Sequence, residues 1–378
     1  MKKNLAIFLY SLGSGGAERV ASILVNNLYK KYNITLVLMN DTIFYKVPEA
    51  VEIIYLEKSK INESGIKKLL KLPFLGLKYK KILKEKEIDI SLSLMTRPNY
   101  INIFAKIFGS RIRTILSERS MFSQYYSSNS LQSLINKKLV RLYNLADLVI
   151  PNSKENGLDL VENFKIKTKI KTIYNLVDIK TIKEKSQQDI DIEKRRFTFV
   201  TIGRLDEGKN HKLILEAIKY IEADLWIIGD GELKEDLGLR IESLGLRDKV
   251  KLLGRHKNPY KFLSRADCFV FSSNHEGFPN VLLEALSCEL PIISTDCQSG
   301  PREILAPKSD FRKKSDDIEI SEYGILTKVN NIKAMQKAMQ MIYKDRDLRY
   351  DYKKKAIIRA KDFDTDVILK EWERIINA

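Results

Sequence analysis

Short apolar runs rich in β-branched residues alternate with longer helical stretches along the whole chain, and this alternation restricts the fold more than any other feature. Strands that alternate with helices are typical of a parallel sheet with crossover helices. The first half contains the runs Leu5–Tyr10, Ile34–Met39, Ile88–Leu94, Arg113–Ser117, Leu148–Pro151 and Ile170–Tyr174. The second half contains the runs Phe197–Ile202, Leu225–Gly229, Val250–Leu253, Cys268–Ser272, Ile292–Thr295 and Gly324–Leu326. We therefore predict an α/β protein built from two Rossmann-like, doubly wound domains.

The boundary between the two predicted domains falls where the sequence becomes polar and poor in aromatic residues. Lys180–Arg196 has this composition, and we interpret it as a linker. It divides the 378 residues into an N-terminal domain over 1–180 and a C-terminal domain over 181–360, each long enough for its own core. Two such domains facing each other leave a central cleft lined by the carboxyl ends of both sheets, where α/β proteins bind ligands.

The composition narrows the class of protein. An apolar content of 44% excludes an intrinsically disordered chain. The three cysteines Cys268, Cys288 and Cys297 cannot form a disulfide framework, and they fit a reducing compartment. The apolar run Leu5–Tyr10 is too short for a signal peptide, and no window offers the roughly 20 apolar residues that span a bilayer. We therefore expect a cytoplasmic protein.

Nearly all of the excess positive charge lies in the first half of the chain. Residues 1–180 hold 30 Lys and Arg against 15 Asp and Glu, whereas residues 181–378 hold 36 against 34. This asymmetry indicates that the two domains have different partners. A nucleic-acid partner has little support, because the sequence contains no zinc-finger spacing, no basic strand flanked by aromatic residues and no basic tail.

The densest positive segment is residues 67–86. One arc of its helical wheel collects the apolar residues Leu72, Leu75, Tyr79, Ile82 and Leu83. Mostly outside that arc lie Lys78, Lys80, Lys81 and Lys84, although Phe74 and Leu77 blur the separation. A basic amphipathic helix of this kind can lie on an anionic membrane surface. The alternative is a domain helix whose leucine face packs on a sheet and whose lysines are only solvated, and both interpretations stay open.

A glycine-rich turn follows the first predicted strand. Residues 11–18, SLGSGGAE, open a predicted helix. Glycines let the backbone approach a ligand closely, and a helix N-terminus favours an anion. The spacing is not G-x-G-x-x-G, however, and a tight strand-to-helix connection also explains the turn.

Two cations flank the turn that follows the first predicted strand of the second domain. Arg204 and Lys209 are placed to clamp a diphosphate, the guanidinium as a fork and the ammonium as a point charge. Surface loops also carry such charges without a ligand. The position after a strand, which points into the predicted cleft, favours binding.

A pair of carboxylates brackets a third predicted strand-to-helix turn, EGFPNVLLE at residues 276–284. Pro279 suits an early helical position, so we expect Glu276 on the loop and Glu284 about two turns inside the helix. This arrangement suits a sugar nucleotide: one carboxylate accepts from ribose hydroxyls, the other holds the sugar, and the diphosphate faces the helix end. The neighbours of Glu284 are apolar, so its carboxylate needs a partner.

No metal site is predicted. The Asp-x-Asp pairs all fall in polar linker or C-terminal segments, and the three histidines, His211, His256 and His275, lack ligand spacing. His275, next to Glu276, is the one histidine that stays open as a functional residue.

These motifs, in their order, resemble those of family 4 glycosyltransferases with the two-domain GT-B fold. The second half is similar through IGRLDEGKN, IIGDGEL, LLGRHKNPY and EGFPNVLLE followed by SGPRE, and the first half through SLGSGGAERV and ADLVIPNSKEN. The segment IYNLVD resembles the family's interdomain junction. Residues 361–378 resemble the helix that crosses back to the first domain. The resemblance covers essentially the whole chain.

The resemblance implies a retaining transfer from a sugar nucleotide without a cofactor or an essential metal. The implied catalytic residues are Glu276, Arg204 and Lys209. The two cations would bind the diphosphate and stabilise the leaving UDP, which needs fixed positive charge. Glu276 would hold the donor sugar and Glu284 the ribose. The implied donor-binding set is completed by Gly15 and Gly16, which close over the phosphates from the first domain, and by Arg255, Gly277 and Phe278.

A closer similarity connects the chain to the N-acetylgalactosaminyltransferases of bacterial lipid-linked N-glycan assembly, through YSLGSGGAERV, LMND, KLPFLGLKYKK and RPNY. It implies UDP-GalNAc as donor and an undecaprenyl-diphosphate-linked oligosaccharide as acceptor, with a second GalNAc added in α1,4 linkage. The protein would be peripheral on the cytoplasmic face of the inner membrane, with residues 67–86 on anionic lipid. Many relatives have a histidine where Arg119 follows Ser117 and Glu118, so here a charged group replaces the imidazole.

Two other functions stay open. An enzyme of the same fold that builds lipopolysaccharide or capsule from another UDP-sugar fits the same motifs. A non-enzymatic basic adaptor for membranes or nucleic acid is the third alternative. An adaptor needs neither the Arg204 and Lys209 pair nor the Glu276 and Glu284 pair, which counts against it.

Overall fold

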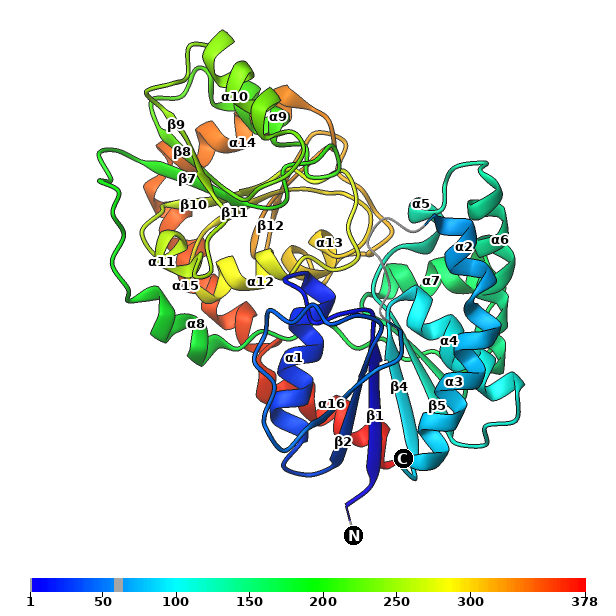
Figure 1. Ribbon diagram of the computed structural model, residues 1–378. Helices are drawn as coiled ribbons and strands as arrows, with labels where there is room; N and C mark the ends of the chain where they lie inside the picture. Colours follow the sequence, from blue (N-terminus) through cyan, green and yellow to red (C-terminus); the bar gives the residue numbers. More distant parts are fainter. Residues whose placement is uncertain (1, 58–63) are drawn as a thin grey trace. The chain divides into compact units, whose positions relative to one another are not determined.

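The computed structural model, which describes residues 2–57 and 64–378, folds into two compact units (Figure 1). Unit 1 comprises the chain up to Asn175 together with Leu369–Ala378, and unit 2 comprises Leu176–Ile368. Each unit is built on one mainly parallel sheet covered by helices. The predicted α/β class with two Rossmann-like sheets is confirmed.

The sheet of unit 1 has six parallel strands in the order β3-β2-β1-β4-β5-β6. Its strands are β1 (Asn4–Leu9), β2 (Asn33–Leu38), β3 (Glu52–Tyr55), β4 (Ile90–Leu94), β5 (Arg113–Glu118) and β6 (Leu148–Pro151). The strand order reverses at β1, which pairs with β2 on one side and with β4 on the other. Such a switch point opens a crevice at the carboxyl ends of the strands. The glycine-rich turn follows β1 and therefore lies at this edge.

Helices lie on both sides of this sheet. They are α1 (Gly16–Leu28), α2 (Gly65–Leu70), α3 (Leu72–Glu85), α4 (Thr96–Ile107), α5 (Phe122–Tyr125), α6 (Leu131–Leu139), the 3-10 helix η1 (Val140–Leu145) and α7 (Lys154–Glu162). Figure 1 shows α3 and α4 on one side of the strands and α1 on the other. The last helix, α16 (Thr365–Asn377), ends in unit 1, where Lys3 Nζ donates to Ile376 O at 3.2 Å and Arg113 donates to Ile375 O at 2.6 Å.

The sheet of unit 2 has seven strands in the order β12-β13-β11-β10-β7-β8-β9, and only the edge strand β12 is antiparallel. Its strands are β7 (Thr198–Ile202), β8 (Asp224–Ile228), β9 (Val250–Gly254), β10 (Cys268–Phe271), β11 (Ile292–Thr295), β12 (Ile318–Ser321) and β13 (Gly324–Thr327). Here the order reverses at β7, between β8 and β10. The two charged motifs follow the adjacent strands β7 and β10, so they share one edge of the sheet.

Helices cover both faces of the second sheet. They are α8 (Ile179–Ser186), α9 (His211–Ile218), α10 (Lys234–Ser243), α11 (Tyr260–Leu263), α12 (Asn280–Ser287), α13 (Pro301–Leu305), α14 (Ile332–Lys344) and α15 (Arg346–Lys361). The core between α9, α10, α14 and the strands is apolar throughout, with residues such as Ile214, Leu225 and Met339 fully buried. No helix in residues 2–57 or 64–378 is long and apolar enough to cross a membrane.

The strand predictions need three corrections. Ile170–Tyr174 forms no strand and makes only an isolated bridge, between Ile170 and Val149. Conversely, the edge strands β3 and β12 were not expected. In β12 apolar and polar residues alternate, so it has no continuous apolar run, whereas β3 does contain the short run Ile53–Leu56, which the prediction missed.

The segment interpreted as a linker is partly helical. Residues 179–186 form α8, whose first turn is capped by Asp178 accepting from Thr181 N at 2.8 Å. Ile179 and Ile182 are buried, and α8 packs on α11 and α12 within unit 2. The polar composition therefore reflects the exposed side of a packed helix.

The predicted basic helix at residues 67–86 divides into α2 and α3 at Lys71. Of the apolar arc, Leu72, Leu75, Tyr79 and Leu83 are buried in the core of unit 1. The Tyr79 hydroxyl shares a hydrogen bond of 2.7 Å with Ser91 Oγ on β4. This arc therefore packs on the sheet, as the second interpretation expected, and is not available to a membrane.

Candidate active site

Two loops at the carboxyl edge of the second sheet are held together by hydrogen bonds. Residues 203–210 follow β7, and residues 272–279 follow β10. Ser272 Oγ donates to Lys209 O at 2.7 Å, and Asn274 N donates to Gly208 O at 2.8 Å. The Asn274 side chain donates to Glu207 O at 3.0 Å. These bonds place the two predicted charged motifs beside each other.

A lysine and a glutamate meet between these loops. Lys209 Nζ donates a short hydrogen bond to Glu276 Oε1, which also accepts from Ser273 Oγ at 2.8 Å. The Glu276 side chain is only 12% exposed, and that of Lys209 26%. Lys209 Nζ lies 5.7 Å from the ring centre of Phe271, within cation–π range. Two residues predicted separately as donor ligands therefore form one ion pair.

The second predicted cation is far more accessible. The Arg204 side chain is 76% exposed, and its Nε lies 2.5 Å from Asp206 Oδ2. Asp206 Oδ1 accepts from Lys209 N at 3.0 Å and so shapes the turn between the cations. Burial alone would raise the pKa of Asp206, but the bonds from Lys209 N and Arg204 hold it below its usual value. Arg204 is free to turn toward an anion, whereas Lys209 is held in place.

The turn that carries Glu276 packs against a second loop. This loop contains the beginning of the SGPRE segment, residues 299–303, which is one of the motifs that resemble those of the family. Ser299 Oγ donates to Gly277 O, and Glu276 N donates to Gln298 O at 3.2 Å. Gly300 has φ +100°, and a Cβ there would lie 2.5 Å from Pro279 Cδ. Only glycine combines this backbone conformation with this close approach.

The glycines after β8 pack directly beneath the Arg204 turn. A Cβ at Gly229 would lie 1.8 Å from Gly203 O, and one at Gly231 would lie 2.4 Å from Leu205 O. The structure gives the glycines a role: they let two strand-end turns approach each other, which fixes the backbone under Arg204.

The remaining predicted donor residues of unit 2 have different surroundings. Glu284 is 2% exposed and lies one turn inside α12 rather than two. Phe278 is 4% exposed, and its ring packs on Phe363 with 5.6 Å between centres, so any ligand contact there would come from backbone. Gly277 lies between Glu276 and Phe278 on the same loop. Arg255 is exposed after β9, at the same edge of the sheet but two strands away from β7.

Gly15 and Gly16 belong to unit 1, where both are exposed at the beginning of α1. The Glu18 carboxylate folds back over this turn, since a Cβ at Gly15 would lie 2.3 Å from Glu18 Oε2. Burial raises the pKa of Glu18, although a backbone hydrogen bond opposes the shift. The helix N-terminus that was predicted to favour a phosphate is thus approached by one of the chain's own carboxyl groups.

Arg119 is only 9% exposed, and its guanidinium bonds to residues of unit 1. Its guanidinium donates to Ser117 Oγ at 3.2 Å and to Asn175 Oδ1. Burial lowers the pKa of Arg119 to about 10, against the opposing effect of Glu118, so the guanidinium remains charged at neutral pH. The buried Glu118 accepts from the Tyr143 hydroxyl at 2.8 Å. This network, which the sequence did not predict, connects the end of β5 to Asn175, where the first segment of unit 1 ends.

Two histidines lie near the charged loops. His211, the first residue of α9, is 3% exposed, and its Nδ1 has no hydrogen-bond partner in the part of the chain that the structure describes. Burial, and then the charge of Lys209, lower the pKa of His211 to about 4, so its imidazole is neutral. His275 is exposed and lies against Gly208, where a Cβ would be 3.4 Å from its ring.

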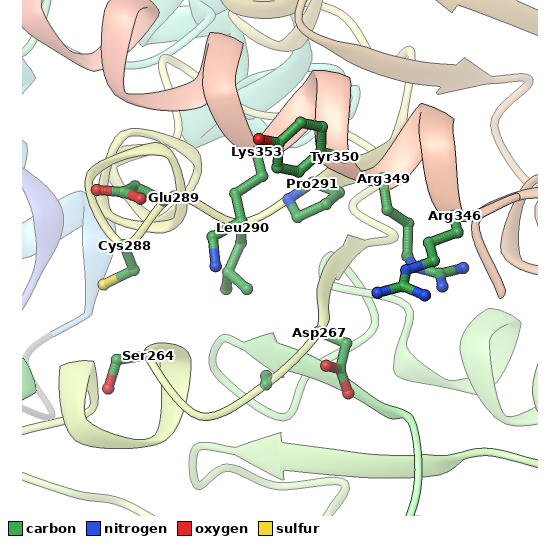
Figure 2. Close-up of a pocket in the computed structure, with 11 residues that line it drawn as sticks. Ser264, Asp267, Cys288, Glu289, Leu290, Pro291, Arg346, Arg349, Tyr350 and Lys353 are labelled. Carbon is green, nitrogen blue, oxygen red and sulfur yellow. The ribbon is translucent and has the colours of Figure 1, made fainter.

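A cavity of about 410 Å³ lies elsewhere in unit 2 (Figure 2). Asp267 and Pro291, which line it, precede β10 and β11, so the cavity is at the amino edge of the sheet, opposite the two charged loops. Arg346, Arg349 and Lys353 of α15 also line it. It shares no residue with the predicted donor set and does not change the assignment of the site.

The paired loops offer a definite chemistry. Two cations, Arg204 and Lys209, and two carboxylates, Asp206 and Glu276, lie on the loops at the carboxyl ends of adjacent parallel strands. Positive groups there can hold a phosphorylated ligand, and a carboxylate can accept from hydroxyls. Within residues 2–57 and 64–378, no group of three His, Cys, Asp or Glu side chains is arranged to hold a metal ion.

Two family models match adjacent parts of the chain. Residues 14–181 match the model described as "Glycosyltransferase Family 4", and residues 182–359 match "Glycosyl transferases group 1". The two matches divide the chain between α7 and β7, close to the boundary between the two compact units.

Two enzymes of Campylobacter jejuni are similar over nearly their whole length. The chain is 43% identical over 373 residues, 98% of each chain, to N-acetylgalactosamine-N,N'-diacetylbacillosaminyl-diphospho-undecaprenol 4-alpha-N-acetylgalactosaminyltransferase. It is 27% identical, again over 98% of each chain, to a GalNAc-alpha-(1->4)-GalNAc-alpha-(1->3)-diNAcBac-PP-undecaprenol alpha-1,4-N-acetyl-D-galactosaminyltransferase. Among solved structures, the fold is similar to that of Anabaena Alr3699/HepE in complex with UDP, with a TM-score of 0.77 and 19% identity over the full length of both chains.

Proposed function

This chain belongs to the family 4 glycosyltransferases, and from that premise we propose that it transfers GalNAc from UDP-GalNAc to an undecaprenyl-diphosphate-linked oligosaccharide. The proposed product has an α1,4 linkage and retains the configuration of the donor sugar. The observation that carries the proposal is the 43% identity, over 98% of both chains, to the Campylobacter enzyme whose name states a 4-alpha transfer of N-acetylgalactosamine to a diphospho-undecaprenol-linked sugar. The lower identity to the enzyme acting on the longer glycan favours a disaccharide acceptor.

The proposed reaction assigns a part to each group of the paired loops. The bond between the anomeric carbon and the β-phosphate oxygen breaks, the acceptor hydroxyl oxygen forms the new bond, and UDP departs with the hydroxyl proton. Lys209 and Arg204 stabilise the negative charge that develops on UDP. Glu276 accepts from hydroxyls of the donor sugar, and Glu284 from the ribose. In unit 1, the exposed turn at Gly15 and Gly16 suits a phosphate group.

No metal is assigned to this reaction. In enzymes that use a divalent metal ion to bind a sugar nucleotide, the metal supplies positive charge at the diphosphate. Here Lys209 is already fixed beside Glu276, and Arg204 is exposed nearby to supply the same charge. We therefore propose that the donor binds and reacts without an essential divalent cation.

The site of action follows from the acceptor. A polyprenyl-linked sugar stays at the membrane, so we propose a peripheral enzyme on the cytoplasmic face of the inner membrane. The excess of 15 positive charges in residues 1–180 supports attraction to anionic lipid and requires no nucleic-acid partner.

The test is transfer of radiolabelled sugar from UDP-GalNAc, UDP-GlcNAc, UDP-Gal and UDP-Glc, each offered with undecaprenyl-diphosphate disaccharide. We expect extension by one sugar from UDP-GalNAc only, and NMR of the product should show an α1,4 linkage. Selective transfer from another donor would redirect the protein to lipopolysaccharide or capsule synthesis. Preference for the trisaccharide acceptor would overturn the acceptor assignment, and binding of vesicles without transfer would favour an adaptor.

A further inference from the structure

The solvent face of α2 and α3 is unusually apolar. Leu70 and Phe74 are 76% and 68% exposed, and Ile66 and Leu77 are 44% and 49% exposed. Their spacing of three to four residues places them along one side of the consecutive helices. The opposite side of α3 is the arc already packed in the core. These helices are therefore apolar on both sides, although only one side is used by the fold.

A second group of exposed apolar residues adjoins the first. Tyr125 on α5 is 72% exposed, and Leu131 and Leu134 on α6 are 60% and 47% exposed. The helices touch each other: a Cβ at Gly65 of α2 would lie 2.0 Å from Gln132 Oε1 of α6, and Ser133 Oγ of α6 donates to Tyr126 O at 2.6 Å. Figure 1 shows α2, α5 and α6 at the same end of unit 1.

We call these seven side chains the α2–α6 patch: Ile66, Leu70, Phe74, Leu77, Tyr125, Leu131 and Leu134. The charge around it is mainly positive, although Glu57 pairs with Lys71 and Glu85 with Lys81. Helices α2, α5 and α6 contain the four lysines Lys67, Lys68, Lys137 and Lys138 and no acidic residue. On the continuation of α3, Lys78, Lys81 and Lys84 are exposed.

We propose that the α2–α6 patch enters the boundary between headgroups and acyl chains of an anionic bilayer, while the surrounding lysines contact the headgroups. Apolar side chains ringed by lysines are the composition of a surface that lies in a membrane interface. An acidic protein partner would pair with the lysines, but it would not require large apolar side chains at four exposed positions of α2 and α3. The proposal rests on the proposed function in one respect, because the lipid-linked acceptor gives the enzyme a reason to stay at a bilayer.

The salt dependence of binding distinguishes insertion of the patch into the bilayer from charge attraction by the lysines alone. Binding by lysines alone falls as salt screens the charges, whereas burial of apolar area does not. The residues of the patch are also not those of the buried arc, so they can be changed without opening the core of unit 1.

The first experiment is co-sedimentation with vesicles of phosphatidylcholine and phosphatidylglycerol at low and high salt. We expect Leu70→Ser with Phe74→Ser to lower the vesicle partition coefficient at least about tenfold at both salt concentrations. Leu239→Ser is the matched control, since Leu239 is 68% exposed on α10 of unit 2 and should leave binding unchanged. Lys67→Glu with Lys68→Glu should weaken binding mainly at low salt. Unchanged partitioning of the Leu70 and Phe74 variant would overturn the proposal.

Insertion itself is measured by a Phe74→Trp variant with lipids brominated on the acyl chain. The two native tryptophans, Trp226 and Trp372, are buried, so quenching would report position 74. We expect quenching of the variant in excess of that of the parent protein. Absence of quenching, or a Leu70 and Phe74 variant that only dissociates a dimer in sedimentation velocity, would reassign the patch to self-association.

A water-soluble acceptor analogue distinguishes the two proposals. If the Leu70 and Phe74 variant loses vesicle binding yet turns over this analogue like the parent, both proposals stand. If the parent protein inserts into vesicles but transfers no sugar to any acceptor, the proposal for the α2–α6 patch is supported and the proposed function is wrong.

Discussion

Lys209 Nζ donates a hydrogen bond to Glu276 Oε1, joining two loops that are 67 residues apart in sequence and follow adjacent strands. The ammonium of Lys209 and the carboxylate of Glu276 neutralise each other. In the proposed reaction, Lys209 binds the diphosphate, and Glu276 accepts from the hydroxyls of the donor sugar. The ion pair is therefore the feature of unit 2 most directly open to test.

Lys209→Met should reduce kcat by a factor of about 100 to 1,000, the usual cost of removing one group that stabilises developing charge. Glu276→Gln keeps the size of the side chain but weakens its hydrogen bonds to the donor sugar, so we expect a comparable loss. Lys344→Ala, at an exposed position at the end of α14, serves as the control. Steady-state kinetics with UDP-GalNAc would measure these effects, and near-normal turnover of Lys209→Met would remove the assignment.

Glu284→Gln should weaken UDP binding by about 1–3 kcal/mol, because an amide is a poorer acceptor for ribose hydroxyls than a carboxylate. Calorimetric titration with UDP measures the change. Glu289→Gln, just beyond the same helix and on the cavity of Figure 2, is the matched control. Since Glu284 is buried, thermal unfolding of the variant must be followed as well, and an affinity equal to that of the parent in a folded variant would contradict the role.

Gly300→Ala should destabilise the protein by roughly 2 kcal/mol or more, because the new Cβ would meet Pro279 at a backbone conformation that L-residues rarely adopt. Gly238→Ala is the contrasting substitution. Gly238 lies inside α10 with nothing within 4 Å of the added atom, so the exchange should stabilise by about 0.5–1 kcal/mol. Urea unfolding distinguishes the two, and equal midpoints would show that the tight contact is absent.

Stability should fall as the solution is acidified from pH 7 to pH 5, in part through His211. Burial lowers its pKa from 6.5 to about 4, so in this window the unfolded chain takes up a proton that the folded state does not. At about 1.4 kcal/mol per pH unit below 6.5, the loss reaches about 2 kcal/mol at pH 5. His211→Gln should flatten the pH dependence of urea unfolding. A variant whose curve runs parallel to that of the parent would mean that His211 is protonated in the folded state.

Removal of divalent cations with a chelator should leave most of the transfer activity in place, because Arg204 and Lys209 supply the positive charge. The radiolabel assay with and without EDTA measures this. Loss of activity on chelation, restored by Mg²⁺, would show that the two cations are not sufficient.

The sequence was informative where a motif directly follows a strand. Gly15 and Gly16 after β1, Arg204 after β7 and Glu276 after β10 lie at carboxyl strand edges because the alternation of strands and helices leaves few other topologies. The edge strand β12 was not predicted, because its alternating residues carry a weak apolar signal, and β3 was missed although it contains a short apolar run. The buried link from Arg119 to Asn175 also had no sequence signal, because its members come from separate elements.

The sequence by itself determined the two α/β sheets, the order of the motifs and the residues that supply charge, since these depend on local spacing. Only the tertiary structure decided which residues meet. Lys209 contacts Glu276 because β7 and β10 are neighbours in the sheet, and no local sequence pattern encodes this arrangement. Likewise, α3 has apolar residues on two sides, and a helical wheel cannot tell which side the sheet will cover. The packing buries Leu75 and Tyr79 and leaves Phe74 in solvent, because a helix resting on a sheet can bury only one face.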